Sequence, residues 1–319
     1  MKKTLTISTA MMMSLFVLAC GGLDPEEDEY RSAVPTTSSL ALSVPASQAG
    51  GGTSDGISDL TQPVLGQRAD LYKVTYEVSR KLNRSLWIGL NTIEDIVQHP
   101  PTSINNGVAT WGPWAPALEP LSWMLAVTKK SPGRYAYALM ARQKADKLGK
   151  FKVILAGTSV KGYSPIFSGF KGLYTANADN LHALDPITYP GTGKLAATYD
   201  TTGLKRAVKL VMTNAATKNS QAVDAVYSYV DRANTSGEFR YAVKADIHKN
   251  GSKDELYAVV SAWDKTGAGK GLAMVTGGDI KAGIKVKQTE CWDAGFGRTF
   301  YKDNFNIHPA EGDPTKCPF

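Results

Sequence analysis

Histidine and carboxylate side chains are the residues most able to carry acid–base or metal chemistry here, and their spacing forms no catalytic motif. The histidines are isolated from one another, and none belongs to the His-Glu-x-x-His pattern of a zinc helix: His99, His182, His248 and His308. Carboxylates are numerous, but sequence alone does not pair them at the separation that glycoside hydrolysis requires. We therefore predict a non-enzymatic protein with no catalytic residue, no metal ligand and no cofactor.

Two glycine-rich stretches, residues 191–195 and 267–271, contain the Gly-Lys pair of a phosphate-binding loop. A Walker A loop also needs a glycine five residues before the second glycine, and a serine or threonine after the lysine. Both stretches lack both features. We predict instead that each is a hairpin turn between two strands.

Tryptophan is concentrated at one place in the chain, where Trp111, Trp114 and Trp123 follow one another closely. Each indole combines a broad apolar face with a polar edge, which suits contact with a carbohydrate or a peptide. The alternative, which we favour, is a hydrophobic plug that fills the space between a helix and a sheet.

The N-terminal segment has the organisation of a secretory signal, with a basic start and an apolar stretch over residues 5–19 that is too short for a stop-transfer helix. It ends in Val17-Leu18-Ala19-Cys20, which resembles the lipobox of bacterial lipoproteins. The resemblance implies cleavage before Cys20, acylation of that cysteine and, with Gly21 after it, a lipid anchor in the outer membrane. The alternative is an ordinary signal peptide with an incidental cysteine.

The other two cysteines lie near the C-terminal end of the chain. In an exported protein such a pair is typical of a disulfide, so we predict that Cys291 and Cys317 are bonded and fix the final segment to the last strands. The alternative is two free thiols.

Composition changes twice along the chain and predicts three parts. Residues 1–19 are the signal, and residues 20–58, with an acidic cluster and then Ser, Pro and Gly, have the composition of a flexible linker. Residues 59–319 form one domain with 33 basic and 23 acidic residues. That excess suits an anionic lipid or polysaccharide, or simply a solvated lysine-rich surface. No basic run is interleaved with aromatics, so we predict no nucleic-acid partner.

Apolar residues recur at spacings of three, four or seven over residues 63–98 and predict a long amphipathic helix that packs on a sheet. Pro63 suits its first turn, and Pro100-Pro101 end it. The apolar stripe consists of Leu71, Val74, Val78, Leu82, Leu86, Ile93 and Val97.

After Pro101 the apolar period becomes two, which is typical of strands with one buried face. The clearest alternation covers residues 238–248, and Asn250-Gly251 then predicts a tight hairpin into residues 256–263. Short loops between successive strands imply antiparallel neighbours. We predict a mainly β (α+β) fold: a large curved antiparallel meander or open barrel with one long N-terminal helix packed against it. The other predicted strands lie near 122–129, 134–142, 151–157, 167–174, 194–200, 206–213, 222–231, 270–276, 284–292 and 297–302.

Three hypotheses of function remain. The tether, the Trp111–Trp114 segment and Cys291-Trp292-Asp293 with Cys317 resemble secreted lipoproteins of myxobacterial type, a group that implies no defined activity. The first hypothesis is therefore a membrane-anchored binding or structural module. The second is a carrier of a lipid or other hydrophobic ligand, since the architecture is similar to periplasmic lipoprotein carriers with an unclosed barrel. The third is a glycan hydrolase, which needs two converging acids beside the tryptophans.

Overall fold

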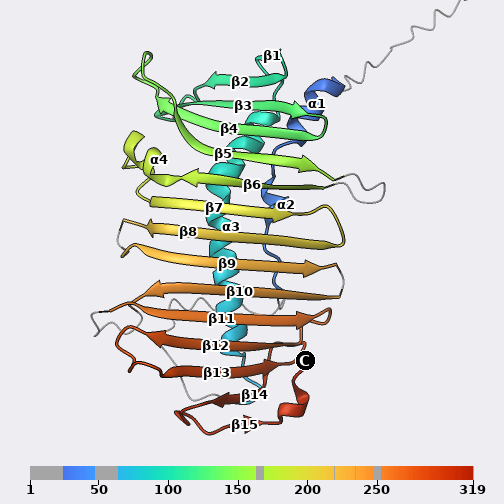
Figure 1. Ribbon diagram of the computed structural model, residues 1–319, viewed down its shortest axis with the longest axis vertical. Helices are drawn as coiled ribbons and strands as arrows, with labels where there is room; N and C mark the ends of the chain where they lie inside the picture. The colour runs from blue at the N-terminus through green and yellow to red at the C-terminus, as the bar shows by residue number, and fades with distance from the viewer. Residues whose placement is uncertain are drawn as a thin grey trace, which may run out of the picture.

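The computed structural model describes residues 24–46, 64–162, 169–218, 220–233, 235–246 and 253–318, with only the backbone for residues 85–88. Its centre is a single 15-stranded antiparallel sheet in which the strands follow one another in sequence order. The first and last strands in this order do not pair with each other, so the sheet is open and does not close into a barrel. The predicted antiparallel meander with one long helix is confirmed. The strands are stacked along the long axis of the molecule, as Figure 1 shows.

All twelve strands predicted from the alternation are present, with ends shifted by a few residues. The strands are β1 (Ser103–Asn105), β2 (Val108–Trp114), β3 (Leu121–Ser131), β4 (Arg134–Gln143), β5 (Lys152–Lys161), β6 (Phe170–Asn177), β7 (Thr192–Asp200), β8 (Lys205–Ala216), β9 (Val223–Arg232), β10 (Ser236–Ala245), β11 (Glu255–Asp264), β12 (Gly269–Gly277), β13 (Lys285–Trp292), β14 (Arg298–Asp303) and β15 (Glu311–Gly312). The short β1 and β15 and the Trp-containing β2 were not among the predicted strands.

Side chains alternate between two faces of the sheet, which we call the helix face and the open face. On β4, Tyr135, Tyr137 and Leu139 are buried on the helix face, while the residues between them are partly exposed. Successive Cβ atoms of a strand point to opposite sides, so this alternation continues from strand to strand wherever the register is regular. The core of the protein therefore lies on one side of the sheet only.

The long helix α3 (Asp70–Val97) crosses the strands on the helix face, nearly along the stacking direction (Figure 1). It begins at Asp70 instead of the predicted residue 63, because residues 64–69 form a turn and an isolated bridge from Arg68 to Gly297. Its stripe is buried at Leu71, Leu82 and Ile93. The predicted docking of this helix on the sheet is confirmed.

A buried ion pair fixes the start of α3 to the last strands. The Arg298 guanidinium donates to Glu290 and, at 2.7 Å, to Asp70, and the backbone N–H of Leu71 donates to Glu290 at 2.6 Å. Burial raises the pKa of the Glu290 carboxyl, and the charge of Arg298 opposes that rise. Beside this pair, the predicted bond between Cys291 and Cys317 is present, with an S–S distance of 2.05 Å. The C-terminal segment is therefore attached to β13.

The predicted linker over residues 20–58 is wrong for the part that the structure describes. Residues 24–46 contain the helices α1 (Pro25–Ser32) and α2 (Thr37–Leu40), and the side chains of Tyr30, Leu40 and Leu42 are buried in the core. The segment is held by polar contacts too. Lys129 and Tyr135 donate to the Glu29 carboxylate, at 2.9 and 2.5 Å, and lower its pKa. A few apolar residues that reach the core are therefore enough to fold this segment onto the sheet, although its average composition is polar.

Several predicted features lie outside the described residues. These are the acylated Cys20, the signal over residues 1–19, the Asn250-Gly251 turn and His248. The stripe residue Leu86 belongs to the part of α3 for which only the backbone is described.

Candidate ligand-binding cavity

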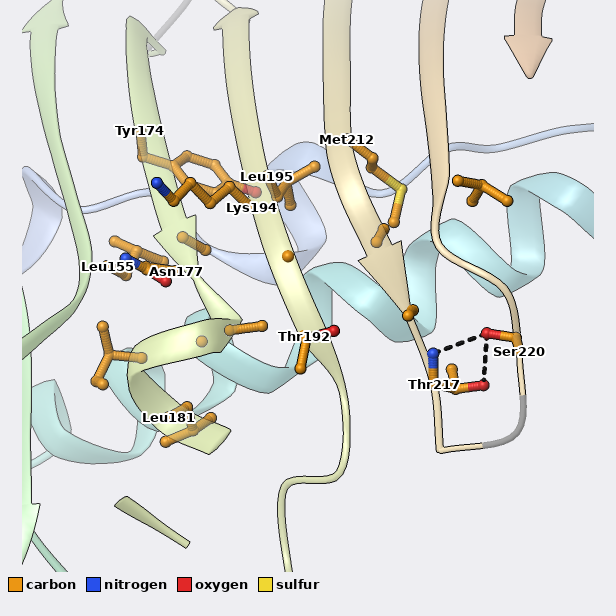
Figure 2. A pocket seen from close by; sticks show the side chains of 18 of the residues that line it. Leu155, Tyr174, Asn177, Leu181, Thr192, Lys194, Leu195, Met212, Thr217 and Ser220 are labelled. Atoms are coloured by element: carbon orange, nitrogen blue, oxygen red, sulfur yellow. Dashed lines mark hydrogen bonds between the residues drawn. The ribbon is translucent and has the colours of Figure 1, made fainter. Parts of the chain in front are cut away.

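A cavity of about 360 Å³ opens on the helix face, between the middle strands and two helices. Its walls are the ends of β5 to β9, the helix α3 and the short helix α4 (Ala178–Leu184), as Figure 2 shows. This volume falls within the range of ~300–1,000 Å³ that is usual for small-molecule sites. It is the natural candidate for a binding site in the described part of the chain.

The cavity exists because small side chains occupy positions where larger ones would fill the space. Ala176, Ala178, Ala215 and Ala216 all line it, from β6, α4 and β8. The rest of the wall is made mainly of larger apolar side chains, among them Leu155, Leu181, Leu195, Met212 and Val223. A wall of this chemistry favours hydrocarbon over a charged or strongly hydrated ligand, because hydrocarbon leaves no hydrogen bond unmade.

Gly89 brings α3 close to the sheet beside the cavity. A Cβ atom added at Gly89 would lie 2.9 Å from Leu155 Cδ1, closer than such contacts occur. The glycine therefore allows the helix and β5 to approach each other at this point, and the helix continues through it without a break.

The helix α4 closes one side of the cavity and is held there by three polar contacts. Asn177 caps its first turn by accepting from the N–H of Asn180 at 3.2 Å. The Asn180 amide donates to the Val153 carbonyl at 2.9 Å, and Asp179 accepts from the Gly193 N–H at 2.7 Å. These contacts attach α4 to both β5 and β7, so the wall is anchored on two strands.

The polar side chains that line the cavity are those of Asn177, Thr192, Lys194, Thr217 and Ser220, together with Tyr174. Thr217 and Ser220 lie at one end and hydrogen-bond to each other, with the Thr217 N–H and hydroxyl 2.8 and 3.0 Å from the Ser220 oxygen (Figure 2). Tyr174 contributes a ring that lies beside Leu195 (Figure 2). Its hydroxyl is buried and has no hydrogen-bond partner among the described residues. Burial raises the pKa of Tyr174, so it stays a neutral hydrogen-bond donor.

The three tryptophans lie on the neighbouring strands β2 and β3 but differ in burial. Trp111 is buried, and its indole N–H donates to the His99 carbonyl at 2.8 Å. Trp123 is buried as well, donates to Glu119 at 2.9 Å, and contributes to the cavity wall. Trp114 pairs with Trp123 in the sheet register but is 42% exposed. Two of the three therefore pack in the core, and one of these two reaches the cavity.

The two glycine-rich stretches have different places in the fold. Residues 267–271 include part of the turn between β11 and β12, as predicted for a hairpin. The prediction of a hairpin turn is wrong for residues 191–195, because the helix α4 connects β6 to β7 and these residues lead from it into β7. Gly193 adopts a positive φ of 102° there and lines the cavity.

Most of the cavity wall was not predicted from sequence. The signal available was a set of alanines at positions that face the core, on strands whose neighbours carry leucine and methionine. Within the described ranges, no group of three His, Cys, Asp or Glu side chains lies close enough together to hold a metal ion.

The fold and cavity together describe a mainly β protein with one open sheet, one long helix and an apolar pocket between them. Comparison of the chain with family models, curated proteins and solved structures finds no match. Within the described residues, no helix is both long enough and apolar enough to pass through a bilayer.

Proposed function

We propose that this protein is a membrane-anchored binding module of the bacterial envelope that takes a single hydrocarbon chain, or an apolar molecule of similar size, into the cavity beside α4. The observation that supports this is the apolar chamber of about 360 Å³ between the sheet and the helices. Apolar ligands gain roughly 25 cal/mol for each Å² removed from water. A chamber of this size, lined mainly by apolar side chains, therefore offers a hydrocarbon chain a favourable environment.

The ligand is expected to carry one polar group. The buried Tyr174 hydroxyl has no partner among the described residues, and a buried donor without a partner costs roughly 1–3 kcal/mol. A carbonyl or hydroxyl oxygen at the end of the chain would accept this hydrogen bond. A fatty acyl ester or a related amphiphile meets both requirements.

The proposal is tested by native mass spectrometry and lipid extraction of the purified full chain, followed by titration with the apolar fluorophore N-phenyl-1-naphthylamine. Ala176→Trp places a large ring in the cavity, and we expect it to weaken binding at least ~10-fold because it removes the space that the ligand fills. Val223→Trp fills the cavity from β9 and serves as a second variant.

The matched control is Ala196→Trp, which places the same ring on the open face of the neighbouring strand β7. It should bind the fluorophore as the parent chain does. Circular dichroism checks that each variant is folded. Failure of the parent chain to bind, or equal binding by the cavity-filled variants, would rule out the cavity as the site.

A further inference from the structure

The open face of the sheet is a broad surface that no helix of the described residues covers between β5 and β12. The helices α1, α2 and α3 all lie on the helix face, where their buried side chains form the core. With neighbouring strands about 4.8 Å apart, this part of the open face extends roughly 30–40 Å along the stacking direction. It is large enough to be an interaction surface.

Most of the positive charge of the sheet points to this face. The open-face positions alternate with the buried residues along each strand. They carry the basic residues Lys171, Lys209, Arg240, Lys244, Lys270, Lys285, Lys287 and Lys302 on strands β6 to β14. From residue 59 onward the chain has ten more basic than acidic residues. Much of this basic excess lies on the open face.

The acidic side chains on this face of the same strands offset only part of this charge, and they lie near the strand ends. Asp200 and Asp264 end their strands and accept hydrogen bonds from Thr202 and Thr266 in the following turns. Asp224 accepts from the Asn214 backbone near a strand end, and Glu238 is paired with Arg240. The centre of the open face is therefore left with lysines and uncharged residues.

Apolar side chains lie between the lysines and are unusually accessible. Leu173, Val226, Leu256 and Leu272 are each between 41% and 49% exposed, on β6, β9, β11 and β12. Within the described residues of β3 to β12, no aromatic side chain points to this face. A surface that binds sugars generally uses aromatic rings, so this composition does not suit a polysaccharide.

We propose that the open face binds the surface of an anionic lipid bilayer, with its lysines among the headgroups and its exposed leucines and valine at the level of the headgroup boundary. A second copy of the chain would bring like charges together across the same surface, which is unfavourable. Dispersed positive charge over a broad face matches a broad negative surface, as in polybasic membrane binding. The proposal does not depend on what the cavity binds.

The test measures co-sedimentation of the purified full chain carrying Cys20→Ala, which removes the predicted acylation site, with vesicles of phosphatidylcholine alone or with 30% phosphatidylglycerol (about one lipid in three, chosen for a strong negative surface potential). We expect binding to the anionic vesicles only, weakened at 0.5 M NaCl (roughly a 4 Å Debye length). The triple variant Lys209→Glu, Lys244→Glu, Lys287→Glu should bind at least ~100-fold more weakly, since each lysine near such a surface contributes about a five-fold factor.

The control reverses the same number of charges elsewhere. Lys147→Glu, Lys265→Glu, Lys281→Glu changes exposed lysines in the turns after β4, β11 and β12 and should retain most of the binding. Both triple variants also carry Cys20→Ala, so that no acyl anchor hides the contribution of the sheet. Equal weakening by both triple variants would show that net charge alone attracts the protein and would overturn the proposal. Binding to dextran sulfate but not to anionic vesicles would overturn it in favour of a polymer.

Discussion

At the scale of single residues, the Glu290–Arg298 pair connects parts of the chain that are far apart in sequence. Both side chains are buried, at 0% and 3% exposure, and together they reach Asp70, Leu71 and the Val64 carbonyl. A buried pair of this kind adds little net stability compared with apolar residues, but loss of one partner leaves a charge without compensation. The pair therefore determines where α3 begins.

This argument predicts a non-additive mutant cycle. Arg298→Met alone should lower the free energy of unfolding by about 3–5 kcal/mol, because it leaves the Glu290 carboxylate buried with the Leu71 N–H as its remaining hydrogen-bond donor among the described residues. The double variant with Glu290→Gln should be less destabilised than Arg298→Met, since the amide is neutral and still accepts from Leu71. Urea denaturation measures both values. Additive losses in the cycle would contradict the pairing.

At the scale of elements, the N-terminal segment is part of the core. Tyr30 is 1% exposed, Leu40 is fully buried, and the Ser159 hydroxyl donates to the Ala33 carbonyl at 2.5 Å. Thr37 donates to the Glu94 carboxylate of α3 from both its hydroxyl and its backbone. The segment thus packs against α3 and the sheet together, and its removal would expose part of the helix face.

Tyr30→Ala tests this placement. We expect the free energy of unfolding to fall by roughly 3 kcal/mol, the cost of deleting a large buried ring. Asp28→Ala, an exposed position on the same helix, should change it by less than ~0.5 kcal/mol. Thermal and urea denaturation of the full chain give the two differences. If Tyr30→Ala were as stable as the parent chain, the segment would be a linker after all.

At the scale of the whole molecule, the predicted lipid anchor would lie very near the body. Only three residues separate Cys20 from Asp24, where the described structure begins, so the anchor could be at most about 14 Å away along the chain. An acyl chain contributes about 0.8 kcal/mol for each buried CH₂, and two chains hold a protein stably. Such an anchor would keep the sheet at the membrane surface, where its open face could reach the headgroups.

The anchor itself is tested by Cys20→Ala. The parent chain, expressed in a bacterium that processes lipoproteins, should incorporate a fatty-acid analogue and sediment with the membranes. The variant should lose the label entirely, because the acceptor sulfur is gone, and should shift toward the soluble fraction. Cys291→Ala with Cys317→Ala is the control, since those sulfurs form the disulfide and should not be acylated. Unchanged labelling of Cys20→Ala would disprove the lipobox interpretation.

What the sequence by itself determined is the strand order and the long helix. Period-two alternation is a local property, because each side chain of a strand points to the face opposite its neighbour, and short loops leave antiparallel pairing as the simple connection. The residues of β10 predict that strand without reference to the rest of the chain. The disulfide was also predictable, since only two cysteines remain once Cys20 is interpreted as the lipobox cysteine.

Only the tertiary structure decided the rest. Residues 24–46 have a polar composition, and the burial of Tyr30 and Leu40 follows from long-range contacts with α3 and the sheet that no local window contains. The cavity is likewise a property of space between five strands and two helices: Ala176 and Ala215 make room only because of what lies across from them. Charge segregation on the open face needs the register of many strands at once, since each lysine alone is an ordinary surface residue.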